Sequence, residues 1–176
     1  MDRELLKSVV EGMIFASGEP LTVKAMADAV RDVSADTIQT VVDALESEYR
    51  LRARGFILAR IAGGYQFRSL PEIAEWIIEL KRIKPAKLGR ASMETLAVIA
   101  YNQPVTRGTI EAVRGVESSS AVKTLTERGL VEVVGRKDVP GRPLLYGTTA
   151  RFLEVFGLPD LASLPSMPQE DTKPDE

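Results

Sequence analysis

The sequence of 176 residues contains no cysteine and no histidine, and it has a single tryptophan. The missing cysteine excludes disulfides, thiol nucleophiles and zinc-thiolate sites, and the missing histidine removes the commonest general base and metal ligand. The phosphate-binding patterns GxxxxGK(S/T) and GxGxxG are absent as well. These absences weigh against an enzyme, so we expect no catalytic, cofactor-binding or metal-binding residues.

Long apolar runs are also missing. No run approaches the roughly 18 residues that a helix needs to cross a bilayer. The first residues, MDRELLKSVVEGMIF, carry acidic side chains and no small-residue cleavage site, so they do not resemble a signal peptide. A hydrophobic content of 44% is enough to build a core. We therefore expect a cytoplasmic globular protein without membrane contact.

Two segments of the chain repeat the same pattern. FASGEPLTVKAMADAV (15–30) aligns without a gap with IAYNQPVTRGTIEAVR (99–114), so that Pro20 matches Pro104 and Thr22 matches Thr106. The register continues into SADTIQTVVDA (34–44) and SSSAVKTLTER (118–128), and RGFILAR (54–60) then matches RGLVEVV (128–134). The offset falls from 84 to 74 residues between these matches, so the first copy is predicted to have the longer third helix.

Each copy is predicted to begin with three helices. Apolar residues at i, i+3 and i+4 indicate a first helix over about 5–16 and again over about 92–101. After a proline break, Thr22 and Thr106 can cap second helices over about 23–30 and 107–113. The third helix is expected from near Ser34 to about 52, and from about 119 to 128 after a stop at Gly115.

A β-hairpin is predicted after each third helix. GFILARIAGGYQFRS should form two strands joined at Gly63-Gly64, and GLVEVVGRKDVPGRPLLYGTT two short strands joined by a proline- and glycine-rich loop. Three helices followed by a hairpin is the winged-helix plan. The predicted fold class is mainly α with small β-hairpins (α+β), in two tandem winged-helix domains; a generic three-helix bundle is the alternative.

The predicted domains are residues 1–70, an N-terminal winged-helix domain; 71–90, a helical and basic linker; 91–157, a C-terminal winged-helix domain; and 158–176, a proline-rich acidic tail. We expect the tail to be disordered from about residue 167. In the linker helix, Trp76 is predicted to be a packing residue. The basic linker residues, which include Lys84, are expected to form a solvated connection, with phosphate contact as the alternative.

The charge pattern bears on nucleic-acid binding. A helix that reads DNA typically exposes Arg, Lys, Asn or Gln. The third helix of the first copy instead places Asp36 and Asp43 outward, and the charges of Lys123 and Glu127 cancel in the second copy. Residues 85–156 hold 10 basic and 7 acidic side chains, a difference of +3 that gives only modest attraction to phosphate.

The loop of the second hairpin, within VVGRKDVPGRPLLYGTT (133–149), holds three basic residues, Arg136, Lys137 and Arg142, and the acidic Asp138. These residues could clamp a phosphate backbone. The prolines and glycines make the loop stiff, however, and apolar residues follow it. A rigid loop beside apolar residues suits a protein partner, and arginines also anchor protein interfaces.

Several stretches carry a resemblance to a known family. RASMETLAVIAYNQPVTRGTIEAVRGV, KTLTERGLVEVVGRKDVPGRPLLYGTTARFLEVFGL and DLASLP resemble the bacterial segregation and condensation protein B family, the accessory subunit of the SMC condensin complex. FASGEPL and GGYQFRS also match the family, and the resemblance covers about residues 5–165. The stretch ESSSAV at the start of the last recognition-type helix departs from the family pattern, which affects only the expected details of partner contact.

The resemblance implies a non-enzymatic subunit that binds the kleisin (segregation and condensation protein A) and reaches the SMC ATPase through it, supporting chromosome condensation and segregation at the nucleoid. It also implies a homodimer, formed largely through the N-terminal domain, with at most weak and non-specific DNA contact. The residues predicted to contact the partner are Arg136, Arg142, Leu145 and Tyr146. Leu145 and Tyr146 have a core role as the alternative, and a DNA-binding transcriptional regulator is the alternative function.

Positions for a dimer contact are less distinct. Five apolar side chains on the first and third helices of the first copy are candidates, although a place in their own domain's core is the favoured interpretation: Leu6, Ile14, Val42, Leu45 and Tyr49.

Overall fold

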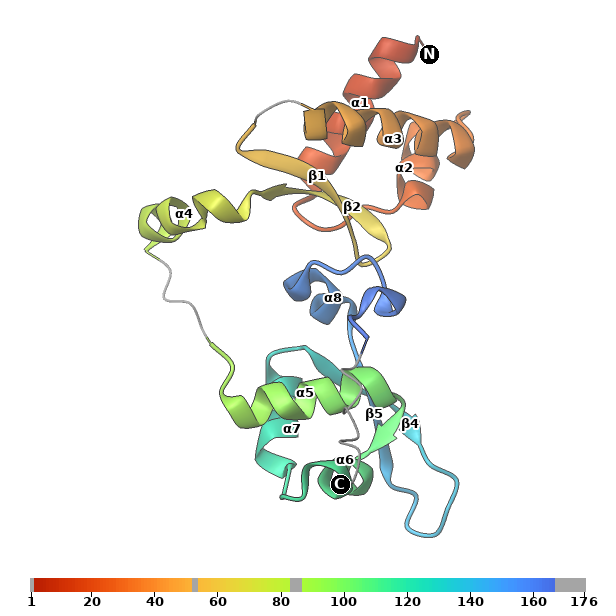
Figure 1. Ribbon diagram of the computed structural model, residues 1–176. Coiled ribbons are helices and arrows are strands. Elements are labelled where there is room, and N and C mark those ends of the chain that lie inside the picture. Colours follow the sequence, from red (N-terminus) through yellow and green to blue (C-terminus); the bar gives the residue numbers. More distant parts are fainter. Residues whose placement is uncertain (1, 52–53, 83–86, 167–176) are drawn as a thin grey trace, which may run out of the picture.

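The structure is a computed structural model that describes residues 2–51, 54–82 and 87–166. The tail predicted to be disordered from about residue 167, and Lys84 of the basic linker, lie outside the described residues. Helices dominate, and the strands form one two-stranded and one three-stranded antiparallel sheet (Figure 1). The prediction of a mainly α protein with small β-hairpins is confirmed.

The first part of the chain forms three helices and a hairpin, followed by a 3-10 turn and a short helix. Their bounds are α1 (Arg3–Ser17), α2 (Val23–Val30), α3 (Ala35–Leu51), β1 (Phe56–Ile61), β2 (Gly64–Ser69), η1 (Pro71–Ile73) and α4 (Ala74–Lys81). The second part repeats the three helices and the hairpin. Its elements are α5 (Arg90–Asn102), β3 (Val105–Thr106), α6 (Arg107–Arg114), α7 (Ser119–Glu127), β4 (Val131–Arg136), β5 (Leu144–Thr148), α8 (Ala150–Phe156) and η2 (Leu161–Ser163).

The two threonines aligned in the sequence repeat perform the same structural task. Thr22 Oγ1 accepts a hydrogen bond from Ala25 N, and Thr106 Oγ1 accepts one from Thr109 N, each over 3.2 Å. Each hydroxyl thus caps the N-terminus of the second helix of its unit. The third helices differ in length as predicted, with 17 residues in α3 and 9 in α7.

The turn of the first hairpin lies one residue earlier than predicted. Ile61 pairs with Gly64, so the two turn residues are Ala62 and Gly63, at φ 50° and 74°. Positive φ at both positions is the geometry of a type I′ turn. Gly64 has a different role, because a Cβ there would lie 2.8 Å from the backbone carbon of Leu21, which bridges to Tyr65.

The second hairpin has a third strand that the sequence analysis did not predict. The strand order is β3-β5-β4, and a bulge interrupts the β4–β5 register between Val133 and Gly135. The loop beyond the strands is closed by a hydrogen bond of 2.9 Å from Lys137 N to Pro143 O.

Each unit has its own buried cluster. In the first, the five apolar residues considered for a dimer contact are all buried, which confirms their core interpretation: Leu6, Ile14, Val42, Leu45 and Tyr49. In the second, side chains of α5, α6 and α7 pack with Phe152 of α8. The predicted domain boundaries stay a prediction, although the separate clusters agree with a division near the linker.

Backbone hydrogen bonds join the two units at the tip of the first hairpin. Ala62 N donates to Leu158 O over 2.9 Å, and Gly63 N donates to Pro159 O over 2.8 Å. Arg68 Nη2 also donates to Glu154 O, at 3.3 Å. Figure 1 shows α8 between this hairpin and α5. The segment after α8 therefore contacts both units: its backbone accepts hydrogen bonds from the first hairpin, and Leu158 packs against the buried cluster of the second unit.

The linker helix differs from its prediction in one respect. Trp76 of α4 is 63% exposed, so it is not a packing residue within this chain. Ile73 of η1 and Ile77 of α4 are the half-buried residues of this segment, and Ile73 Cδ1 would lie 3.4 Å from a Cβ on Gly55. Among the helices of the described ranges, none is long and apolar enough to cross a membrane.

Candidate partner-binding surface

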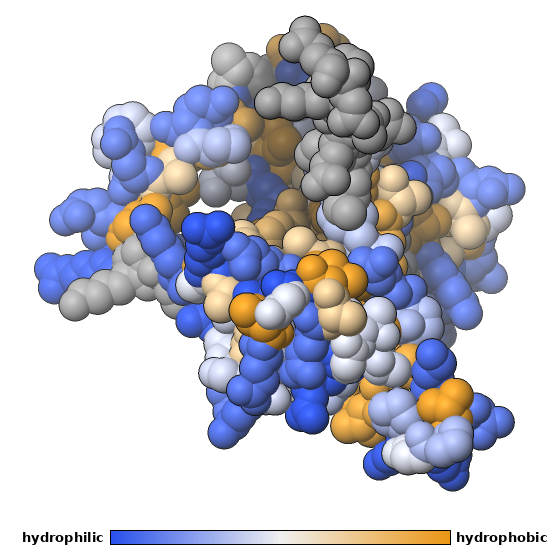
Figure 2. Space-filling view, turned by 60° about the horizontal axis from the view of Figure 1, so that its bottom comes forward, coloured by the Kyte–Doolittle hydropathy of each residue, from blue (hydrophilic) through white to orange (hydrophobic). Residues whose placement is uncertain are grey.

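The two arginines of the predicted site lie at the loop of the second hairpin. Arg136 ends β4 and Arg142 lies on the return of the loop at φ 38°, and both are exposed. Arg136 Nη1 donates a hydrogen bond of 3.2 Å to the backbone oxygen of Arg142. One guanidinium thus helps to hold the loop closed, while both arginines remain accessible to a partner. Figure 2 shows this loop protruding at the lower right, with apolar and hydrophilic surface side by side.

The other two predicted residues are neighbours on β5. Tyr146 pairs with Val105 on one side and Val133 on the other, and Leu145 pairs with Thr106 and Gly135. Both side chains are half-buried, and Tyr146 packs against the second core cluster. Consecutive residues of a strand point to opposite faces of the sheet. A partner that lies on one face of the sheet therefore cannot contact both side chains. The structure therefore brings Tyr146 into a surface hollow and leaves Leu145 on the other face.

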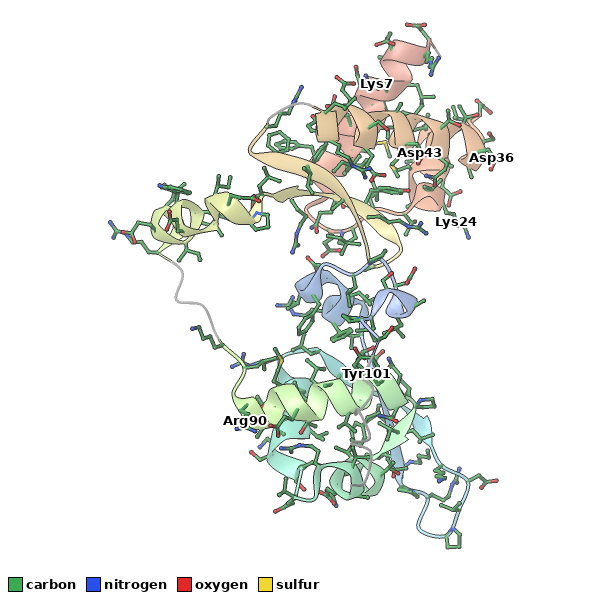
Figure 3. All side chains as sticks on the ribbon, in the orientation of Figure 1. Lys7, Lys24, Asp36, Asp43, Arg90 and Tyr101 are labelled. Atoms are coloured by element: carbon green, nitrogen blue, oxygen red, sulfur yellow. The ribbon has the colours of Figure 1, made fainter. Side chains whose placement is uncertain are left out.

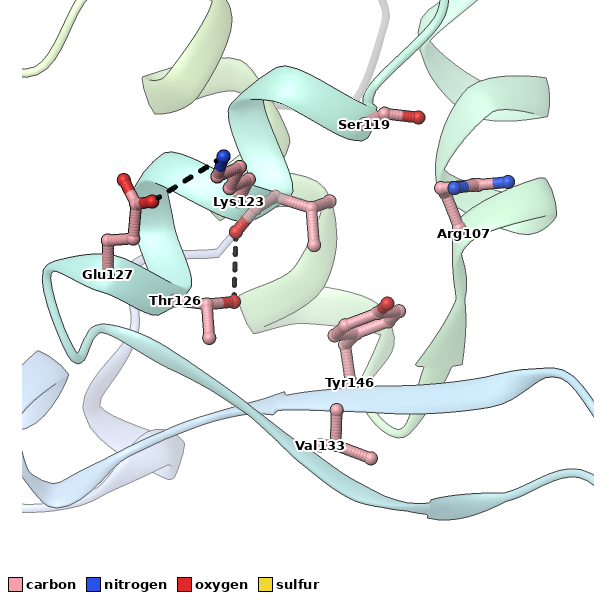
Figure 4. Close-up of a pocket in the computed structure, with 8 residues that line it drawn as sticks. Arg107, Ser119, Lys123, Thr126, Glu127, Val133 and Tyr146 are labelled. Atoms are coloured by element: carbon pink, nitrogen blue, oxygen red, sulfur yellow. Dashed lines mark hydrogen bonds and ion pairs between the residues drawn. The ribbon is translucent and has the colours of Figure 1, made fainter.

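Tyr146 forms the floor of a groove between α7 and the hairpin, which we call the α7–wing groove. Its volume is about 270 Å³. Figure 4 shows Tyr146 and Val133 rising from the strands, α7 along one side and Arg107 of α6 on the other. The lining residues are Arg107, Ser119, Val122, Lys123, Thr126, Glu127, Val133 and Tyr146. A second hollow of about 260 Å³ lies beyond Tyr146, against Pro143 and Leu144.

The charges around the α7–wing groove are largely paired with one another. Lys123 Nζ lies 3.9 Å from Glu127 Oε1, and Arg107 Nε lies 3.7 Å from Glu111 Oε1. Exposed ion pairs of this kind contribute little stability. Because their opposite charges cancel, the groove has little net positive charge to attract phosphate. The floor is apolar, because Val133 is 48% exposed beside the Tyr146 ring. Such a groove suits an apolar segment of a protein better than a phosphate backbone.

The corresponding helix of the first unit is acidic on its outer side. Asp36 and Asp43 are exposed on α3 (Figure 3). Gln39 lies between them and is tied down, because its Nε2 donates to Asp43 Oδ1 at 2.7 Å and to Tyr65 Oη at 2.8 Å. The prediction that α3 does not present a base-reading surface therefore agrees with its geometry.

Sequence reasoning missed Val133, Arg107 and the α7 side of this groove as a group. Strand alternation together with the pairing of Val133 and Tyr146 would have placed these two residues on one face. The sequence alone did not predict this pairing, because the bulge at Val134 adds one residue to β4 and so shifts which residues of β4 share a face with Tyr146. The contribution of α7 depends on tertiary packing, and no local pattern indicates it.

The perturbed ionisable groups lie elsewhere and have structural roles. Hydrogen bonds from Arg90 Nε at 2.7 Å and Arg114 Nη2 at 3.1 Å lower the pKa of the Glu94 carboxyl, and the bond from Arg114 ties α6 to α5. Burial, followed by a hydrogen bond to Glu11, raises the pKa of the Tyr49 phenol. Within the part of the chain that the structure describes, no group of three or more acidic side chains is placed to hold a metal ion.

Two units of three helices and an antiparallel hairpin define a winged-helix protein, and its α7–wing groove has an apolar floor and largely paired charges. The family model described as Segregation and condensation complex subunit ScpB matches residues 8–167. The chain belongs to this family. A relative from Syntrophotalea carbinolica, Segregation and condensation protein B, is 47% identical over 167 residues, which cover 95% of this chain and 84% of the relative.

Solved structures include similar proteins. ScpB from Mycobacterium tuberculosis is 32% identical, with a TM-score of 0.43, and the match covers 90% of this chain and 98% of that chain. A crystal structure of a dimer of the ScpB N-terminal domain complexed with an ScpA peptide is 26% identical, with a TM-score of 0.41. That match covers 44% of this chain and 95% of that chain.

Proposed function

We propose that this chain is a non-enzymatic subunit of an SMC condensin complex, which binds the kleisin subunit and thereby supports chromosome condensation and segregation. The observation that carries the proposal is the apolar floor of the α7–wing groove, formed by Val133 and Tyr146. An amphipathic helix of a partner can place its apolar face in such a groove. Membership of the family supports the choice of a kleisin as the partner.

The four predicted residues would divide the contact between them. Tyr146 would meet the apolar face of the kleisin segment, while Arg136 and Arg142 would reach its polar side from the loop. Leu145 faces the other side of β5, so its part would be to support the strand or to meet a segment that wraps around the hairpin. Aromatic and arginine side chains are the residue types that most often dominate protein interfaces.

The wider assembly is part of the same proposal. The SMC ATPase would be reached through the kleisin, and two copies of this chain would pair, largely through the first unit. The related N-terminal domain crystallised as a dimer with an ScpA peptide, and we extend that pairing to this chain. The protein would then lie at the nucleoid in the cytoplasm, with DNA contact that is weak and non-specific.

The alternative, a transcriptional regulator that reads DNA, is disfavoured by charge. Exposed Asp36 and Asp43 on α3 would repel phosphate, and Lys123 of α7 is paired with Glu127. Specific DNA binding by helix-turn-helix proteins depends on cationic phosphate contacts and on a third helix that enters the major groove.

Two experiments together test the proposal. The untagged chain should copurify with the kleisin and SMC proteins of its own cell. In a titration of the purified chain against duplex DNA, we expect weak binding over a range of salt concentrations. Tight binding with a steep salt dependence, together with failure to recover the kleisin, would reverse the assignment in favour of the regulator.

A further inference from the structure

The α7–wing groove adjoins the second hollow, and the two share a pair of residues. Arg107 and Tyr146 line both the groove and the hollow of about 260 Å³ beyond it. These two side chains therefore form the boundary between the two recesses. Apolar side chains lie on either side of that boundary, Val133 in the groove and Leu144 in the second hollow. The surface thus offers two apolar recesses separated by one guanidinium group and one phenol.

The first unit contains the equivalent tyrosine in a closed arrangement. Tyr65 bridges to Leu21 of the first unit. Tyr146 pairs with Val105, which matches Leu21 in the sequence repeat, so the two tyrosines are equivalent. Tyr65 is only 5% exposed, and its Oη accepts a hydrogen bond of 2.8 Å from Gln39 Nε2. The first unit therefore satisfies its phenol from within the chain.

The second unit leaves its phenol open. Lys123 occupies the position of Gln39 in the repeat, but its Nζ lies 3.9 Å from Glu127 Oε1 instead of reaching the tyrosine. Among the residues that the structure describes, none forms a hydrogen bond with Tyr146 Oη. Figure 4 shows the ring between α7 and Arg107. The hydroxyl of this half-buried side chain is thus free to bind a ligand.

Arg107 supplies further hydrogen-bond donors at the same boundary. It is the first residue of α6 and occupies the position of Val23 in the repeat. Its Nε lies 3.7 Å from Glu111 Oε1, which is too far for a hydrogen bond. That oxygen instead accepts hydrogen bonds from Ser118 N at 3.1 Å and from Ser118 Oγ at 3.3 Å. The two terminal nitrogens of Arg107 donate to none of the described residues.

The surrounding charges favour a carboxylate over a phosphate backbone. The pairs Arg107–Glu111 and Lys123–Glu127 cancel in net charge, so the groove offers hydrogen-bond donors and little positive field. A guanidinium group matches a single carboxylate through two parallel hydrogen bonds. The loop beyond the second hollow adds three basic side chains and one acidic one: Arg136, Lys137, Arg142 and Asp138.

We infer that the partner segment carries a carboxylate between two large apolar side chains, and that Arg107 and Tyr146 Oη bind this carboxylate while the apolar side chains fill the two recesses. The inference rests on the proposed function for the identity of the partner as the kleisin. Arg107 then selects an acidic segment over a neutral or basic one. The first unit cannot bind the same segment, because Val23 replaces Arg107 and Gln39 occupies the hydroxyl of Tyr65.

Calorimetric titration of the kleisin into the full-length protein tests the role of Arg107. Arg107→Val installs the residue of the first unit and should weaken binding about tenfold or more, because it removes charged hydrogen bonds. Arg90→Val is the matched control. Arg90 also begins a helix and also pairs with the glutamate four residues later, but it lines neither recess, so affinity should stay unchanged. Kleisin binding that Arg107→Val does not weaken would overturn the inference and leave the proposed function standing.

The two equivalent tyrosines give a second test. Tyr146→Phe removes only the hydroxyl and should weaken kleisin binding about threefold or more, with no loss of stability in urea unfolding. Tyr65→Phe should lower stability and leave the affinity unchanged, because its hydroxyl bonds to Gln39. Equal affinity of the natural chain and Tyr146→Phe would contradict the inference.

Peptide selection tests the chemistry of the ligand without the kleisin. Random dodecapeptides displayed on phage are selected on the full-length natural chain and, in parallel, on Arg107→Val. The natural chain should enrich peptides with Asp or Glu between apolar residues, and Arg107→Val should not. Enrichment of apolar peptides without an acidic residue would overturn the inference. Enrichment of the acidic pattern by a chain that does not bind the kleisin would support the inferred chemistry and overturn the proposed function alone.

Discussion

Single glycine positions decide how closely the first hairpin approaches the rest of its unit. Gly64 follows the turn and packs against the backbone of Leu21, where an added Cβ would lie 2.8 to 2.9 Å from three backbone atoms. Backbone atoms cannot move aside as the end of a flexible side chain can. The hairpin is therefore fixed to the segment before α2 at this residue.

Gly64→Ala should consequently destabilise the protein by about 1–3 kcal/mol, the usual cost of overpacking. Gly12→Ala is the matched control, because Gly12 lies inside α1 with no atom within 4 Å of the added Cβ. It should stabilise by about 0.5–1 kcal/mol, since alanine favours helix. Urea unfolding of both variants measures the two free energies, and equal effects would contradict the packing account of Gly64.

Glu94 provides a test based on pH. Its carboxyl accepts hydrogen bonds from Arg90 and from Arg114, whose side chain is only 7% exposed. These bonds lower the folded-state pKa below the unfolded value of about 4.3. The ionised carboxylate therefore stabilises the fold above that pH, and the contribution is lost as the pH falls through the folded-state pKa.

Glu94→Gln should accordingly lower the free energy of unfolding at pH 7, and the difference from the natural sequence should shrink below about pH 4. Urea midpoints measured from pH 3 to 8 provide the check. Glu132→Gln, at an exposed residue of β4, is the control and should show a much smaller dependence. A Glu94→Gln effect that stays constant over the whole pH range would rule out an electrostatic origin.

At the scale of elements, the start of the second helix in each unit depends on one hydroxyl. Thr106→Ala removes the bond to Thr109 N and should destabilise the protein by about 1 kcal/mol. Thr124→Ala is the control, because its hydroxyl bonds to a carbonyl inside α7 that the helix already uses. Its effect on the unfolding free energy should be close to zero, and a loss equal to that of Thr106→Ala would contradict a capping role.

The elements also show how far sequence reasoning extends. Helices α2, α3, α6 and α7 were predicted to within two residues at either end, because a capping residue or an apolar period marks each of them locally. Helix α8 was missed although its signals are present: Thr149 Oγ1 caps it, and Gly157 ends it at φ 66°. Strand β3 has two residues and exists only because β5 lies beside it, so no local pattern predicts it.

The candidate site was predictable in part for a similar reason. The basic, stiff loop and Tyr146 stand out in the sequence. The α7–wing groove does not, because it requires α7 and the bulged strand β4 to be brought together by the core. Trp76 was assigned to packing from periodicity alone, which indicates an apolar face but cannot say whether anything in the same chain covers it.

At the scale of the whole molecule, the two units are joined by the hairpin tip as well as by the linker. The amides of Ala62 and Gly63 lie in a turn, where exchange with solvent is usually fast. Their hydrogen bonds to Leu158 and Pro159 should slow that exchange in the full chain. Arg68→Ala, which removes the contact with Glu154, should speed it, whereas Arg60→Ala in the same hairpin should not. Hydrogen exchange followed by NMR measures this, and fast exchange in the natural sequence would contradict the junction.

The central claim is that a kleisin segment binds in the α7–wing groove. Val133 and Val134 are adjacent on β4 and are 48% and 51% exposed, but only Val133 lines the groove with Tyr146. Calorimetric titration of the kleisin into the full-length protein should show that Val133→Asp weakens binding about tenfold or more, while Val134→Asp has little effect. Equal affinity for the two variants, or binding that neither variant changes, would contradict the claim.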